Sequence, residues 1–197
     1  METLKPLATL LEPDARQPSF SVFDPELRAF RPFTLEDLYS RVSQIELHSG
    51  VPETVRSHFA TALNLVAYSW HFYPFNVTAQ FMGYVSVEYA LRTRYPEKPV
   101  APFKRLVERA VREGLIQDKG FSHYRDPELN QSPPELQSLM IEPPANAYGL
   151  ALIESIPFLR NSLAHGTSML HMHGVKSVQM CADFINQLFE RPPRDGS

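Results

Sequence analysis

The amino-acid sequence predicts an all-α fold, a helical bundle of four to five core helices. Apolar residues recur at spacings of three and four along several segments, which is the period of one helix face. No segment alternates apolar and polar residues over a convincing length, so no β-sheet is expected. The 197 residues are 43% hydrophobic and 21% charged, so we expect one ordinary globular domain with a core of its own.

The chain divides into an N-terminal arm with a short helix (1–50), a helical domain (51–191) and a tail (192–197). Prolines interrupt every period within residues 1–33, so this arm is expected to be irregular and to wrap its own domain or a partner. The expected docking points of the arm are four phenylalanines: Phe20, Phe23, Phe30 and Phe33.

A capping box predicts the first helix, because Thr34 is followed at the third position by Asp37; this helix should reach Leu47. A long amphipathic helix is expected over 52–70, where Pro52 occupies a turn that tolerates proline. A further helix is expected over 76–95. Its apolar stripe contains Glu88, which should have a partner because burying a lone carboxylate is costly.

A shorter helix should follow Pro102 and end at Gly114. The polar, proline-bearing segment 117–146 then predicts a long insertion before the fourth core helix, with helical turns at 126–129 or 134–140. That helix should cover 146–164, and Pro157 should kink or interrupt it. The last helix should begin between residues 168 and 177 and run to Phe189.

Charge and cysteine content limit the classes of function. The net charge of −3 gives no global basic field for nucleic acid, and a single cysteine allows no intramolecular disulfide, as expected in a reducing cytoplasm. No signal peptide or membrane span is expected. Segment 92–112 nevertheless carries a net charge of +5. Its basic residues form either an RNA-binding face or a merely solvated one: Lys104, Arg105, Arg109 and Arg112.

The most concentrated chemistry lies at 160–165, at the end of the fourth core helix. The Arg160 guanidinium can hold two phosphate oxygens, Asn161 can position a phosphate, and His165 can transfer a proton near neutral pH. Arg160 and His165 would lie about 140° apart around a straight helix, so they converge poorly on one phosphate. Either Gly166 ends the helix and redirects His165, or two chains share one cleft.

The placement of Arg160 and His165, late in an apolar helix and before another amphipathic one, resembles the R-x4-6-H motif of the HEPN superfamily. Segment 86–92 also resembles the second helix of many HEPN domains, and the resemblance covers roughly 52–189. It implies a homodimeric, metal-independent endoribonuclease without a cofactor, with a role in defence or stress response. By resemblance, Glu88 would support Arg160. Some HEPN toxins carry a tyrosine where this chain has Thr167, so that toxin type is not expected.

Three alternatives remain. Arg160 and Glu88 could form a purely structural ion pair, with His165 stabilising the helix end. The domain could instead be a non-catalytic dimerisation module that binds a nucleotide or a partner protein. His171 and His173 suggest a metal site, but residues two apart on a helix point to different faces, so we expect packing or surface positions.

Overall fold

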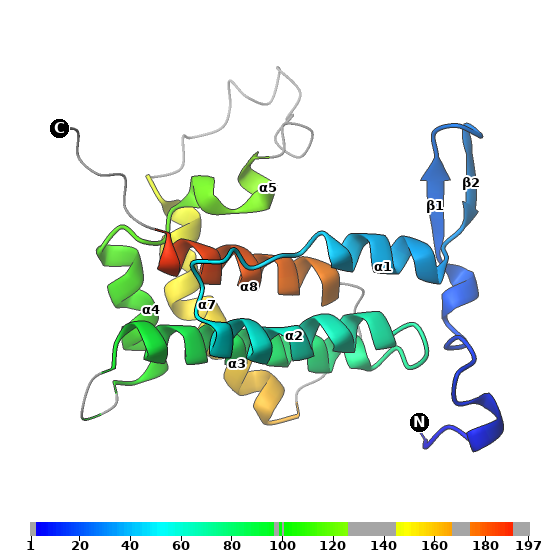
Figure 1. Cartoon of the computed structure of the whole chain (residues 1–197), viewed down its shortest axis with the longest axis horizontal. Coiled ribbons are helices and arrows are strands. Elements are labelled where there is room, and N and C mark those ends of the chain that lie inside the picture. The colour runs from blue at the N-terminus through cyan, green and yellow to red at the C-terminus, as the bar shows by residue number, and fades with distance from the viewer. Residues whose placement is uncertain (1–2, 97–98, 100, 126–144, 167–173, 191–197) are drawn as a thin grey trace.

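A computed structural model of the chain describes residues 3–96, 99, 101–125, 145–166 and 174–190, and it confirms the all-α bundle (Figure 1). The α-helices are α1 (Leu35–Ser43), α2 (Glu53–Tyr68), α3 (Phe75–Arg94), α4 (Phe103–Arg112), α5 (Ser122–Arg125), α7 (Ala147–Ala164) and α8 (Gly174–Phe189). Short 3-10 helices are η1 (Leu7–Thr9), η2 (Gln17–Ser19) and η3 (Asp118–Gly120). The strands β1 (Ser21–Asp24) and β2 (Ala29–Pro32) form one hairpin.

Helix α3 is the central element of the bundle. It packs against α2, α8 and α7 (Figure 1), and it buries residues around most of its circumference. At Gly83, an added Cβ would lie 3.0 Å from the Sγ atom of Cys181, so a larger residue would have to displace that side chain where α3 approaches α8. Cys181 is fully buried, and burial raises the pKa of its thiol, as suits the inert core position that its apolar stripe predicts.

Helix α1 begins as predicted but ends early. Thr34 and Asp37 form the capping box, whereas the helix stops at Ser43 instead of reaching Leu47. The reason is a contact from a distant helix, because Asn186 on α8 accepts a hydrogen bond from the His48 backbone N–H (3.0 Å). The Asn186 side-chain amide also donates to the Glu46 carbonyl (2.9 Å). These bonds satisfy the backbone of an extended segment that would otherwise continue the helix.

The prediction of an irregular arm is wrong for residues 21–32, which form an antiparallel hairpin. The Asp24 side chain accepts hydrogen bonds from the backbone N–H groups of Glu26 and Leu27, and Arg28 adopts a left-handed conformation. Arg31 then bridges Asp24 and Asp37, which ties the hairpin to the start of α1. Strands of only four residues are too short to show an alternating pattern.

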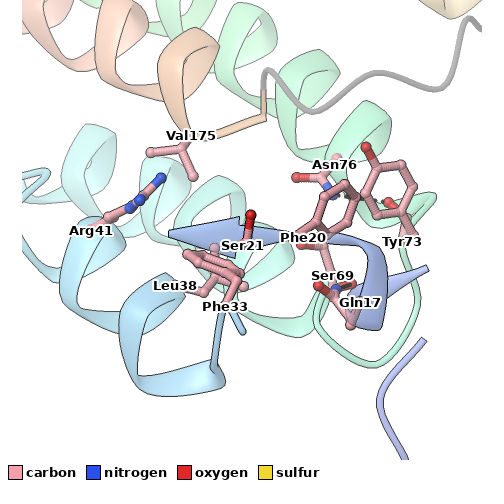
Figure 2. Close-up of a pocket in the computed structure, with 10 residues that line it drawn as sticks. All are labelled: Gln17, Phe20, Ser21, Phe33, Leu38, Arg41, Ser69, Tyr73, Asn76 and Val175. Atoms are coloured by element: carbon pink, nitrogen blue, oxygen red, sulfur yellow. Dashed lines mark hydrogen bonds between the residues drawn. The ribbon is translucent and has the colours of Figure 1, made fainter. Parts of the chain in front are cut away.

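Two of the four predicted phenylalanine docking points hold the arm against the bundle. The Phe20 ring stacks on Tyr73 at 5.8 Å, and Phe33 lies 6.3 Å from Trp70; Figure 2 shows Phe20 beside Tyr73. Phe23 and Phe30 instead contact each other on the hairpin, with exposed fractions of 53% and 74%. The arm therefore docks at its two ends, and the hairpin projects from the domain (Figure 1).

The buried carboxylate of Asp14 provides the polar anchor of the arm. Asp14 donates its backbone N–H to the Trp70 carbonyl (2.8 Å), and its side chain accepts the Tyr73 N–H (2.9 Å). Burial alone would raise the pKa of Asp14, but hydrogen bonds from the backbones of Tyr73 and Arg16 and the Arg16 charge outweigh that effect and lower it. The ionised form of Asp14 thus holds the arm to the turn between α2 and α3.

The predicted insertion begins later than expected. Phe121 is fully buried, and the Ser122 backbone N–H donates to Asp183 on α8 (2.8 Å). The Gln117 N–H likewise donates to the Gln187 side chain (2.8 Å). Residues 117–124 therefore pack against the bundle, with Phe121 in its core. Segment 126–144 with its predicted helical turns, the pair His171 and His173, and tail 192–197 lie outside the described residues.

Helix α7 runs without interruption through Pro157, so the expectation that proline would end a first segment is wrong. Ile156 and Pro157 are both buried, and this packing offsets the backbone hydrogen bond that proline cannot make. No helix in the described part of the chain is long and apolar enough to cross a membrane.

If Phe121 anchors residues 117–124 in the core, Phe121→Ala should lower the free energy of unfolding by about 3 to 5 kcal/mol, because it leaves a cavity in a packed interior. Urea denaturation monitored by circular dichroism measures this change. Phe158→Ala is the matched control, because that ring is 69% exposed on α7 and should cost less than about 1 kcal/mol. Equal effects of the two substitutions would contradict the core assignment.

Arm docking should weaken as the pH falls below about 4. Asp14 has a lowered pKa in the folded state, so its contribution is complete above the unfolded value of 3.8 and is lost as the carboxylate becomes protonated. Fluorescence of Trp70, the single tryptophan, should report this loss, and Asp14→Asn should remove the pH dependence. Asp24→Asn is the control, because Asp24 contacts only the hairpin. A transition that persists in Asp14→Asn would assign the effect to another group.

Candidate active site

The last turn of α7 presents the predicted motif. Helix α7 ends at Ala164, where the His165 N–H still donates to the Asn161 carbonyl (3.0 Å). Gly166 follows with a φ of +80°, and its N–H donates to the Leu163 carbonyl (3.1 Å). Gly166 therefore ends the helix in a left-handed conformation, as its position in the sequence indicates.

Glu88 on α3 faces α7 and pairs with Arg160. Its residue exposure is only 8%, and its Oε2 atom lies 2.7 Å from Arg160 Nη2. This contact confirms the expectation that the carboxylate on the apolar stripe has a partner. Because α3 is the central helix, the ion pair fixes the end of α7 relative to the core.

Arg92 is a second partner of Glu88. The Arg92 Nη2 and Nε groups both donate to Glu88 Oε1, at 2.6 and 3.2 Å. Glu88 thus shares its two oxygens between two guanidinium groups. Arg92 was not singled out from the sequence, although its spacing of four residues from Glu88 on one helix could have indicated the pair.

The remaining contacts of Arg160 place Asn161 beside it. Arg160 Nη1 donates to Asn161 Oδ1 (3.0 Å), whereas the buried Nε group of Arg160 has no hydrogen-bond partner among the described residues. The Arg160 side chain is 33% exposed. Two guanidinium groups face one carboxylate, so this cluster keeps one excess positive charge near the surface. Such a charge favours an anion that reaches the exposed part of Arg160.

His165 lies apart from this cluster. It is solvent-exposed, and no hydrogen bond or ion pair joins its ring to Glu88, Arg160 or Asn161 within the described ranges. One chain therefore brings together three of the four predicted site residues and leaves the fourth, His165, exposed at the helix end.

The basic face of α4 is largely neutralised. Lys104 pairs with Glu154 of α7, Arg109 pairs with Glu113, and Arg112 pairs with Glu108. Arg105 is exposed and forms no ion pair with any described residue. Exposed pairs of this kind contribute about 0 to 1 kcal/mol each, so a phosphate backbone could displace them. The sequence alone does not reveal that these cations are paired.

The described residues contain no group of three or more His, Cys, Asp or Glu side chains that could hold a metal ion. Comparisons with models of known protein families, with curated proteins and with solved structures find no match for this chain. The interpretation of the site therefore rests on its own geometry.

Glu88 should contribute more to stability than any single cation beside it. Glu88→Ala leaves two partly buried guanidinium groups without a counter-charge and should cost about 2 to 3 kcal/mol of unfolding free energy. Arg92→Ala and Arg160→Ala each leave Glu88 one partner and should cost about 1 kcal/mol. Thermal and urea denaturation measure these values. Glu108→Ala, which breaks an exposed pair, is the control; an equally small loss for Glu88→Ala would refute the shared pairing.

Proposed function

We propose that this chain is a metal-independent endoribonuclease of the HEPN type. One observation carries the proposal: a buried carboxylate, Glu88, holds Arg160 beside Asn161 at the end of α7, five residues before the exposed His165. A phosphate-binding group and a titratable group are thereby presented at one end of one helix.

In the proposed reaction, Arg160 binds the phosphate and stabilises its charge as the 2'-oxygen of RNA attacks the phosphorus. The 2'-oxygen–phosphorus bond forms and the bond from phosphorus to the 5'-oxygen breaks. His165 accepts the proton of the 2'-hydroxyl or donates one to the leaving oxygen. Asn161 accepts from Arg160 through Oδ1, which leaves its NH2 group to contact the substrate. Glu88 is a positioning residue that orients Arg160.

The separation of His165 from Arg160 within one chain supports a homodimeric site. A two-fold axis near the end of α7 would bring His165 of one subunit towards Arg160 of the other. In this proposal RNA also contacts Arg105 on α4, with the other basic residues of that helix released from their exposed ion pairs. The proposed setting is the cytoplasm, in defence or stress response.

A non-catalytic dimerisation module is the second candidate. The burial of Glu88 and its double pairing favour it, because the same contacts would serve a purely structural ion-pair cluster. The two candidates differ in the role of His165. The endoribonuclease needs His165 for proton transfer, whereas the dimerisation module does not, since no described residue requires His165 for packing.

Cleavage of RNA in excess chelator tests the proposal. The purified chain should generate 2',3'-cyclic phosphate ends, and His165→Ala and Arg160→Ala should each slow the reaction by about 10²- to 10⁴-fold. His71→Ala and Arg56→Ala are matched controls of the same residue types away from the site, and they should retain activity. Product ends and rates are measured by gel electrophoresis and mass spectrometry.

Activity that persists in His165→Ala would eliminate the mechanism. A wild-type protein that is dimeric by analytical ultracentrifugation but leaves RNA intact would favour the interaction module. Mixed dimers of Arg160→Ala and His165→Ala subunits test the shared site, because one of their two composite clefts would keep both groups and should regain part of the activity.

A further inference from the structure

A cavity of about 480 Å³ lies between α1, α5, α8 and the first turn of α7. Its volume falls within the range of about 300 to 1,000 Å³ that is usual for small-molecule sites. Figure 1 places α1, α5 and α8 on one side of α3 and the end of α7 on the other. The cavity is therefore separate from the cluster of Glu88 and Arg160.

Two exposed cations line this cavity, Arg41 from α1 and Lys176 from α8. Neither forms an ion pair with a described residue, in contrast to most cations of α4. The Arg41 guanidinium instead lies over the Phe33 ring, 5.0 Å from its centroid. Packing on an aromatic face reduces the freedom of Arg41 while leaving its hydrogen-bond donors available for an anion.

The acidic residue among the described lining residues already accepts several hydrogen bonds. Asp183 is 4% exposed, and its carboxylate accepts hydrogen bonds from the Ser122 N–H and hydroxyl, at 2.8 to 2.9 Å. It also accepts from the Gln179 amide (3.0 Å). These donors stabilise the negative charge of Asp183. Two cations and one carboxylate among the described lining residues leave the cavity with a net positive charge.

The lining also contains aromatic residues. Tyr148 and His123 pack edge to face with ring centroids 4.5 Å apart. Burial raises the pKa of Tyr148 to about 12, so its hydroxyl stays protonated at neutral pH and remains a donor. Gln44 adds a side-chain amide at the rim of α1. A cavity lined by both aromatic rings and two cations suits a ligand that has both a flat ring and a phosphate.

A smaller cavity of about 120 Å³ adjoins this one and shares Arg41 and Val175 with it. Figure 2 shows Arg41 extending towards Val175 at its edge. Within the smaller cavity, the Gln17 side chain donates to the carbonyls of Ser69 and Trp70, and Asn76 donates to that of Tyr73. The larger cavity is the one that both Arg41 and Lys176 line.

We propose that the larger cavity binds a mononucleotide, with Arg41 and Lys176 on its phosphate and its base against Tyr148 and His123. This site is independent of the proposed ribonuclease activity, because it shares no residue with the cluster at the end of α7. Neither cation was singled out from the sequence, since Arg41 and Lys176 lie 135 residues apart and only the packing of α1 beside α8 brings them together.

Isothermal titration calorimetry of the full chain with each of the four ribonucleoside monophosphates tests the site. At least one should bind with one-to-one stoichiometry. The matching nucleoside and ribose 5-phosphate should each bind at least about tenfold more weakly, because the nucleoside lacks the phosphate and ribose 5-phosphate lacks the base. Arg41→Ala and Lys176→Ala should each weaken binding about tenfold, whereas Arg56→Ala, which removes an exposed cation of α2, should not.

Circular dichroism verifies that each variant is folded, and the exposed position of Lys176 keeps the test valid if Arg41→Ala is unstable. Absence of heat for all four monophosphates at millimolar concentration would overturn the proposal. So would ribose 5-phosphate binding as tightly as the nucleotide. Loss of nucleotide binding in Arg160→Ala but not in Lys176→Ala would place the ligand at the end of α7 instead and would equally overturn it.

Discussion

The burial of one charged side chain, Glu88, constrains the centre of this molecule. Helix α3 is covered by α2, α8 and α7, so a carboxylate at this position has little contact with water, and its side chain is only 11% exposed. An isolated buried carboxylate would be strongly unfavourable. The fold resolves this with two guanidinium groups, one from the next turn of α3 and one from α7. The position of Arg160 is therefore set by the core, although the residue lies near the surface.

The exposure of the three residues increases from the interior to the solvent. Glu88 is buried, Arg160 is one-third exposed, and His165 lies exposed just beyond the last turn of α7. A phosphate-binding arginine gains from such support, because its orientation is fixed before a ligand arrives. A proton-transferring histidine gains from the opposite condition, since it must meet the substrate. The end of α7 provides both a supported arginine and an exposed histidine. Within one chain, however, no described contact joins the side chains of Arg160 and His165.

The long helices were predictable because their signals are local. The stripes of α2 and α3 and the capping box of α1 reside in consecutive residues and need no knowledge of the rest of the fold. The failures arise from long-range contacts. Asn186 shortens α1 from more than 130 residues away, and Asp183 draws Ser122 into the core. The pairing of Glu88 with Arg160 was predictable because a buried charge requires a partner; the convergence of Arg41 and Lys176 was not, because no local pattern joins them.

The cations of α4 and those of the larger cavity differ in whether they are paired with carboxylates. On α4, Lys104, Arg109 and Arg112 each have a carboxylate neighbour, which lowers the potential that an approaching phosphate meets. Arg41 and Lys176 have none among the described residues. Between the two sites, α3 and α8 pack closely at Gly83. The two sites share no residue, so we expect nucleotide binding and RNA cleavage to be separable properties of the chain.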